Sequence, residues 1–201
     1  MRNNPPTTSR PIADLIKKIK ACTVCAGLPL GPNPIFQIGS EAKILIAGQA
    51  PGRITHLKST PFDDPSGNRL RDWLGVDRAS FYDPSKFAIV PMGFCFPGSK
   101  KGGDLPPRTE CEENWRTQVL DLLPNIELTL VIGKYAMDYH LGGKQGKTLT
   151  ETVRNWESFW PDLLPLPHPS PRNGIWLKKN PWLEEEVLPK LKLKVAQLTT
   201  N

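Results

Sequence analysis

The sequence lacks a hydrophobic run long enough to span a bilayer, although 38% of its 201 residues are hydrophobic. Its first residues, MRNNPPTTSRP, lack the apolar core of a secretory signal, so we expect an intracellular, cytoplasmic protein. It contains no internal repeat and no low-complexity block, which excludes repeat architectures. The length predicts one domain over residues 1–201, with residues 1–10 flexible.

The common nucleotide-binding motifs are also missing. The glycine-rich stretch GQAPG (48–52) contains neither G-x-G-x-x-G nor G-x-x-x-x-G-K-[ST]. Pro51 also removes a backbone donor that a phosphate cradle would use. What remains is one polar side chain, Gln49, on a stiff turn. An amide can read the edge of a base, but the motif alone favours an ordinary turn between a strand and a helix.

Charge and proline content point to a basic protein with stiff loops. Lys and Arg total 26 and Asp and Glu total 20, which gives a net charge of +6. Such an excess is equally compatible with a polyanionic partner and with a solvated basic surface. The 22 prolines are interleaved with hydrophobic segments, which indicates structured loops rather than disorder.

Four short apolar runs predict buried parallel strands: 42–48, 86–92, 127–133 and 162–167. Helical patterns alternate with them, and capping boxes are expected at Thr109–Glu112 and Thr148–Glu151. The sequence therefore predicts an α/β protein, a three-layer α/β/α sandwich around a short four-stranded parallel sheet. In such sheets ligands bind beyond the carboxyl ends of the strands. The loops after Gly48, Met92 and Pro167 are therefore the expected site.

Only four cysteines are present: Cys22 and Cys25 in CTVC, Cys95 in GFCFPG and Cys111 in TECEENW. In an intracellular protein, a C-x-x-C pair indicates metal binding or redox chemistry more often than a structural disulfide. Four thiolates suit a tetrahedral zinc ion or an iron–sulfur cluster, and spacing does not separate the two. Buried cysteines acting as small hydrophobic residues are the simpler alternative.

Two of the expected loops hold a ring among prolines. Phe62 lies in STPFDDPSG, where it either packs in the core or stacks on a nucleobase. Asp63 and Asp64 follow it, and we expect them to cap the next helix. His168 lies between Pro167 and Pro169 in LPLPHPSPRNGIW. Proline restricts its own φ and the preceding residue, so this imidazole is held in a rigid segment.

These motifs together resemble the uracil-DNA glycosylase superfamily, and most closely its iron–sulfur family 4 branch. The resemblance covers residues 20–192 and rests on GQAPG, the four cysteines, and the series Pro61, Phe62, Gly67 and Leu70. It implies a 4Fe–4S cluster on Cys22, Cys25, Cys95 and Cys111, with zinc the less favoured occupant. It also implies a monomeric hydrolase of base-excision DNA repair, whose partner is DNA containing a damaged or deaminated base.

The segment HPSPRN is closer to the single-strand-selective monofunctional uracil glycosylases. That resemblance implies that His168 helps to release the base and that Arg172, with Ser170, contacts DNA. The flipped base would stack on Phe62. The remaining residues implied for base binding are Ala50, Pro51, Gly52 and Asn173, and those implied for catalysis beside His168 are Gln49 and Asp64.

The sequence also departs from these patterns. Gln49 replaces the family 4 glutamate, Pro91 replaces an asparagine that reads the base, and Ala50 replaces a water-holding side chain of other branches. Asp63, Asp64 and Asp104 are candidates to position the water, although Asp104 in GGDLPPR has the sequence context of a turn residue. Two alternatives remain: a non-catalytic nucleic-acid-binding protein on this fold, and an unrelated α/β enzyme acting on a small nucleotide.

Overall fold

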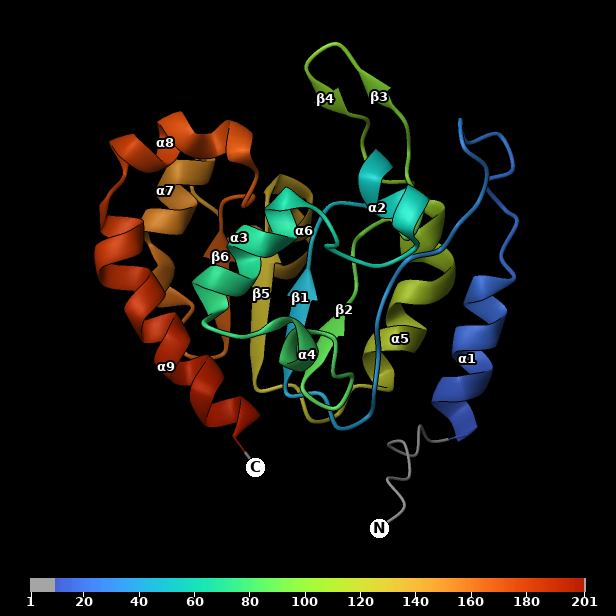
Figure 1. The fold of residues 1–201 in the computed structure, drawn as a ribbon, viewed down its shortest axis with the longest axis horizontal. Coiled ribbons are helices and arrows are strands. Elements are labelled where there is room, and N and C mark those ends of the chain that lie inside the picture. The colour runs from blue at the N-terminus through green and yellow to red at the C-terminus, as the bar shows by residue number, and fades with distance from the viewer. Residues whose placement is uncertain (1–9, 201) are drawn as a thin grey trace.

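A parallel four-stranded sheet forms the centre of the molecule (Figure 1). The computed structural model describes residues 10–200. The predicted flexibility of residues 1–10 concerns residues outside this range, except Arg10, which begins a helix. The strands are β1 (Ile44–Ala47), β2 (Phe87–Ile89), β5 (Leu128–Ile132) and β6 (Leu163–Leu166), in the order β2-β1-β5-β6. All four predicted strands are therefore confirmed.

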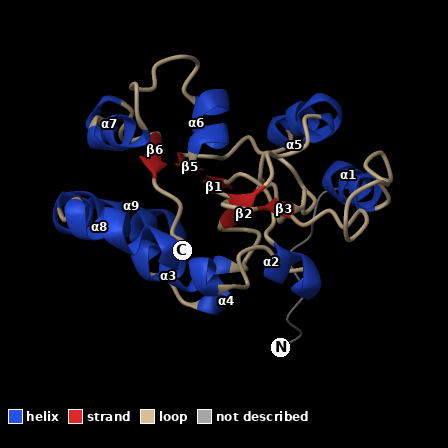
Figure 2. Ribbon diagram, turned by 90° about the horizontal axis from the view of Figure 1, so that it is seen from above, coloured by secondary structure: helices blue, strands red, loops and turns tan. Residues whose placement is uncertain are grey.

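Helices cover both faces of the sheet, which confirms the three-layer α/β/α architecture (Figure 2). Helices α3, α4, α8 and α9 lie on one face, and α1, α5, α6 and α7 lie on the other. Their bounds are α1 (Arg10–Lys20), α2 (Arg53–Lys58), α3 (Pro65–Leu74), α4 (Arg78–Phe81), α5 (Thr117–Asp121), α6 (Lys134–His140), α7 (Leu149–Arg154), α8 (Gly174–Lys179) and α9 (Leu188–Thr199). Shorter irregular turns are η1 (Glu112–Arg116), η2 (Trp156–Ser158), η3 (Pro171–Asn173) and η4 (Leu183–Val187).

The strands are buried because apolar side chains pack on both faces of the sheet. Ile44 and Ile46 of β1 pack with the cluster that includes residues of α3 and α9. Leu45 points the other way and joins the cluster formed with α1 and α5. This alternation follows the two-residue period of a strand and explains why β1 is apolar at every position. No helix within residues 10–200 is long and apolar enough to cross a membrane.

The structure confirms one of the two capping boxes that the sequence predicts. Thr148 Oγ1 accepts a hydrogen bond from the Glu151 amide at 3.1 Å, as the predicted capping box requires. The box predicted at Thr109 is wrong, because the Glu112 amide bonds the Thr109 backbone oxygen instead, at 2.9 Å. That segment begins with the wider turn of η1 rather than with a capped α-helix.

A small hairpin rises beyond the carboxyl ends of the sheet (Figure 1). It consists of β3 (Ser99–Lys100) and β4 (Gly103–Asp104), which pair only with each other. Helices α2 and α8 flank the same end of the molecule, next to the loops after β1 and β6. These three elements were not predicted from the sequence, and they lie at the end of the molecule where the ligand site is expected.

Candidate functional site

A cavity of about 450 Å³ opens at the carboxyl ends of the strands. Its walls come from the loop after β1, the Phe62 turn, the hairpin and the segment after β6. Most of the site residues expected from the sequence line this cavity: Gln49, Ala50, Pro51, Gly52, Phe62, Asp64, Asp104, His168, Ser170 and Arg172. Asn173 and the water candidate Asp63 do not line it. The structure thus brings together residues that are more than 100 positions apart in the sequence.

The loop after β1 is held by its neighbours on both sides. Backbone amides of Met92 and Gly93 donate to the carbonyls of Gly48 and Gln49, at 2.8 and 2.9 Å. The Gln49 side-chain nitrogen donates to the Leu105 carbonyl at 2.9 Å. Gln49 therefore ties the strand mouth to the base of the hairpin, so its amide nitrogen is already engaged within the protein.

Phe62 is held in a strained conformation at the cavity wall. Its φ is +54°, in the left-handed region that a bulky side chain rarely adopts. Its carbonyl accepts from Arg71 Nη1 at 3.3 Å and lies against Gly67, where an added Cβ would be 1.7 Å from the Phe62 oxygen. The Phe62 ring meets Phe81 edge-on at 6.3 Å between centroids. The turn therefore fixes one edge of an aromatic ring that lines the cavity.

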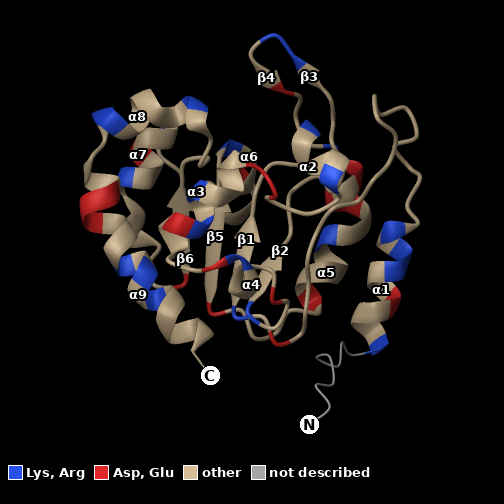
Figure 3. Cartoon of the chain, in the orientation of Figure 1, with Lys and Arg blue, Asp and Glu red and all other residues tan. Residues whose placement is uncertain are grey.

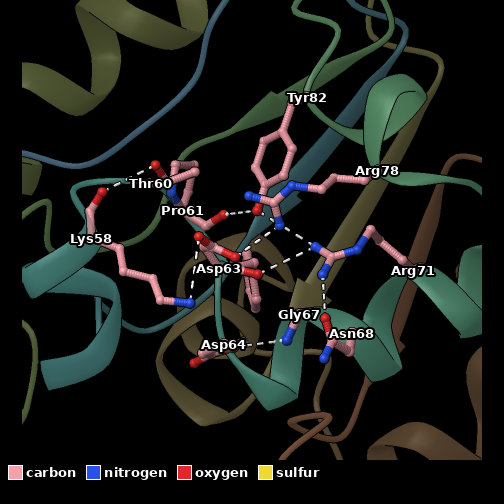
Figure 4. A network of polar contacts seen from close by, with 11 residues as sticks. Lys58, Thr60, Pro61, Asp63, Asp64, Gly67, Asn68, Arg71, Arg78 and Tyr82 are labelled. Carbon is pink, nitrogen blue, oxygen red and sulfur yellow. Dashed lines mark hydrogen bonds and ion pairs between the residues drawn. The ribbon is translucent and has the colours of Figure 1, made fainter.

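The polar network around this turn separates the two neighbouring aspartates (Figure 4). Asp63 pairs with Arg78 at 2.8 Å and with Lys58 at 3.5 Å, and the Arg78 hydrogen bond lowers the pKa of Asp63. Asp64 instead caps α3, as expected, by accepting from the Gly67 amide at 2.8 Å. Only Asp64 lines the cavity, so Asp63 belongs to the support of the loop.

His168 lies two residues after the end of β6, and two side chains hold the backbone of its segment through hydrogen bonds. Asn173 Nδ2 donates to the His168 carbonyl at 2.7 Å, and Arg69 of α3 donates to the Ser170 carbonyl at 2.8 Å. Burial lowers the pKa of His168 from its usual value, while Asp64 and Asp104 act in the opposite direction. The ring is therefore neutral at neutral pH and able to donate one N–H bond. Asn173 is placed to support His168 rather than at the cavity wall.

A buried arginine supports the wall formed by the end of β2, and sequence reasoning missed it. Arg116 is fully buried and donates to the carbonyls of Val90 and Pro91 at 3.3 and 3.1 Å. Its Nη2 lies 2.6 Å from His140 Nε2, and burial followed by the Arg116 charge lowers the pKa of His140 to about 4. A neutral His140 is consequently available to accept from the guanidinium. The sequence feature that could have revealed this role is the position of Arg116, three residues before Val119 on the apolar face of a helix.

Asp104 is one of the three aspartates that the sequence suggested for positioning the water, although its sequence context was that of a turn residue. It lies in β4 of the hairpin rather than in an isolated turn, and its side chain lines the cavity together with Ser99. Ser99 Oγ donates to Asp104 Oδ1 at 2.5 Å. The hairpin itself was not predictable, because two-residue strands rich in glycine and lysine show no alternation of polar and apolar residues.

The four cysteines line a second, smaller cavity with Phe94 and Trp115. All four are free thiols, and the Phe94 amide donates to Cys111 Sγ at 3.4 Å. Burial raises the pKa of Cys95 to about 11 and also raises that of Cys111, so a cation is needed to keep them as thiolates. Among residues 10–200, no three Cys, His, Asp or Glu side chains form the ligand group of a single metal ion. The structure thus brings the four predicted ligand residues together around one cavity.

Comparison with known protein families agrees with this arrangement. The family model described as the uracil DNA glycosylase superfamily matches residues 36–192, which is well over half of the chain. The chain therefore belongs to the uracil DNA glycosylase superfamily. Its α/β fold and the placement of its loops at the carboxyl edge of the sheet are consistent with this membership.

A relative within this superfamily is the type-4 uracil-DNA glycosylase of Archaeoglobus fulgidus. The two sequences are 26% identical over 130 residues, which cover 63% of this chain and 61% of the relative. The match thus spans less than two thirds of the relative's length. It agrees with the resemblance to family 4 that the cysteines and GQAPG indicate.

Proposed function

We propose that this protein is a monofunctional DNA glycosylase that hydrolyses the bond between deoxyribose and uracil or another deaminated base. The observation that supports this most is that Phe62 and His168 line one cavity. A flipped base needs a stacking surface and a donor that reach it together. A molecule with these rings in separate spaces would offer no such pocket.

The reaction follows from these positions. Flipping the base into the cavity costs a few kcal/mol, which stacking on Phe62 and contacts of Arg172 offset. As the glycosidic bond breaks, negative charge gathers on a carbonyl oxygen of the leaving base. The neutral His168 ring donates to that oxygen, and Asn173 keeps the ring in place through its bond to the backbone. A donor already in position stabilises the transition state without reorganising.

The surface around the cavity suits a DNA backbone. Arg172 is exposed at the rim, and Lys100 and Lys101 lie at the exposed tip of the hairpin. Lys and Arg also occur on α2 and α8 at this end of the molecule (Figure 3). Such side chains bind phosphates and fix the position of the strand, while Ser170 and Arg172 reach the gap left by the flipped base. We further propose that the protein acts as an intracellular monomer.

We also propose that Cys22, Cys25, Cys95 and Cys111 hold a 4Fe–4S cluster. The cluster would join the segment after α1, the loop after β2 and the start of η1, and its contribution is structural. The cavity residues perform the chemistry without it. We leave the released base as uracil or another deaminated base. Pro91 and Ala50 stand where other family branches place an asparagine that reads the base and a side chain that holds the water.

The test is cleavage of labelled oligonucleotides that contain uracil, hypoxanthine or xanthine, in single and double strands, followed by alkali. We expect release of at least one base, and His168→Ala should lower the single-turnover rate by about 10²–10³-fold. The matched control is His56→Ala, whose ring lies outside the cavity lining and should leave the rate within a factor of about three. Binding without release of any of these bases would favour the non-catalytic alternative.

A further inference from the structure

Two carboxylates line the cavity, Asp64 and Asp104, and each accepts one hydrogen bond on Oδ1, but the two bonds serve different parts of the structure. Asp64 Oδ1 accepts from the Gly67 amide and so serves the start of α3. Asp104 has no such structural duty toward a helix, because its single hydrogen bond comes from the neighbouring strand, from Ser99. Ala50 supplies no polar group from the loop after β1. Asp104 is therefore the carboxylate best placed to act on a bound substrate.

The second oxygen of Asp104 lies against the GQAPG turn, at the wall of the cavity. A Cβ added at Gly52 would be 3.6 Å from Asp104 Oδ2, so this oxygen faces the GQAPG turn with no side chain between them. The next residue, Leu105, accepts from Gln49, which fixes the base of the hairpin to the same turn. The charge of Asp104 also acts on His168, which places both groups on one cavity.

We infer that Asp104 is a catalytic residue whose carboxylate holds the attacking water and faces the sugar as it becomes positively charged. This inference rests on the proposed glycosylase function. It assigns the water to the hairpin, a different element of the cavity wall from the segment that carries His168. Ser99 orients the carboxylate through Oδ1, so that Oδ2 is the oxygen turned to the water.

The step balances without another reactant. The bond between C1′ and the base nitrogen breaks, and its electron pair leaves with the base, whose charged oxygen accepts a bond from His168. The water oxygen then bonds C1′, and one of its protons passes to the Asp104 carboxylate and on to solvent or to the departed base. The products are the free base and an abasic sugar that carries a hydroxyl group at C1′. A carboxylate beside the sugar also stabilises its positive charge.

The experiment compares Asp104→Asn, Asp104→Glu and the control Asp121→Asn on the base that the wild type releases. Asp121 is exposed at the end of α5 and far from the cavity lining. We expect Asp104→Asn to lose about 10²–10³-fold in single-turnover rate, Asp104→Glu to regain part of it, and Asp121→Asn to match the wild type. Affinity for an oligonucleotide that contains an uncleavable abasic-site analogue, and the Tm, should change little in all three.

The outcomes separate the two proposals. If the wild type releases a base and Asp104→Asn does so at the same rate, the role of Asp104 is overturned and the glycosylase function stands. If Asp104→Asn loses rate together with Tm or affinity for the abasic-site analogue, its role is structural and the inference also fails. If the wild type releases no base, both the function and the role of Asp104 are overturned.

Discussion

Phe62 shows how a single residue stores strain at this site. A left-handed φ at a bulky residue costs about 1–3 kcal/mol and persists only where the surroundings enforce it. Here Arg71 and Tyr82 hold the carbonyls of Phe62 and Pro61, at 3.3 and 2.9 Å. The missing side chain at Gly67 allows the turn to close. The strain therefore presents the ring to the cavity at the expense of local stability.

At the residue scale we predict that Gly67→Ala destabilises the protein and abolishes its activity. The added methyl would collide with the Phe62 carbonyl at 1.7 Å, which forces the turn to open. We expect a loss of about 2–4 kcal/mol in unfolding free energy, measured by urea denaturation. Gly174→Ala is the control, because its Cβ meets nothing within 4 Å and its backbone is helical. Equal stability of the two variants would contradict this account of the turn.

Residues also mark the limit of what the sequence reveals. The pattern around His168 and Phe62 predicted that both belong to one site, and they line one cavity. The supporting role of Arg116 was not predicted, and Asp104 was one of three aspartates among which the sequence did not choose. Arg116 depends on carbonyls 25 and 26 positions away in the chain, and Asp104 depends on where a short hairpin lies. Long-range contacts of this kind leave no local periodicity.

At the scale of elements, the segment from His168 to Asn173 behaves as one braced unit. Its 3-10 turn begins at Ser170, whose side chain accepts from the Arg172 amide, and it ends at Asn173, which bonds back to His168. Prolines reduce its freedom further. The rigidity expected from the sequence thus comes from two sources, the prolines and these hydrogen bonds.

We predict that Asn173→Ala lowers the cleavage rate about 3–30-fold, because the His168 ring loses its fixed orientation. Stability should fall by about 1 kcal/mol through the lost hydrogen bond. Asn155→Ala is the matched control, since it removes a comparable bond of 3.0 Å to Ser158 far from the cavity lining. Single-turnover kinetics and denaturation of both variants test this, and an equal rate in the two would remove Asn173 from the site.

The elements of the sheet were predictable, while those around its edge were not. Continuous apolar runs identified all four strands, since a strand buried on both faces needs no polar positions. Helices α2 and α8 and the hairpin lie at the surface and have mixed composition. Each of them continues a loop that leaves the sheet, so its position depends on the path of that loop, and no local sequence pattern encodes that path.

At the scale of the whole molecule, the cysteine site links parts that the sheet does not join. Cys22 and Cys25 follow α1, Cys95 follows β2, and Cys111 precedes η1. A bound cluster would therefore fasten the segment after α1 to the loop after β2 and to the start of η1. The four cysteines form no disulfides with one another, so a shared cluster would be the group that restrains these three segments together.

We predict that protein purified without oxygen is brown, contains iron rather than zinc, and loses this iron in Cys111→Ser. That variant should also lose at least about 3 kcal/mol of stability, which lowers the Tm by roughly 6–12 °C for a chain of this size. Metal analysis and thermal denaturation provide the measurements. Zinc in stoichiometric amount, or full iron content in Cys111→Ser, would show that the cysteines serve another purpose.

The hairpin pairs only with itself, and this has a consequence for how the chemistry is distributed. Asp104 is supplied by an appendage, whereas His168 extends directly from a strand of the central sheet. Exchanging residues 99–104 for another loop would leave every pairing of that sheet intact. On our proposal, the departing base and the water that replaces it would be handled by two separate elements, so the hairpin could be exchanged without changing the segment that carries His168.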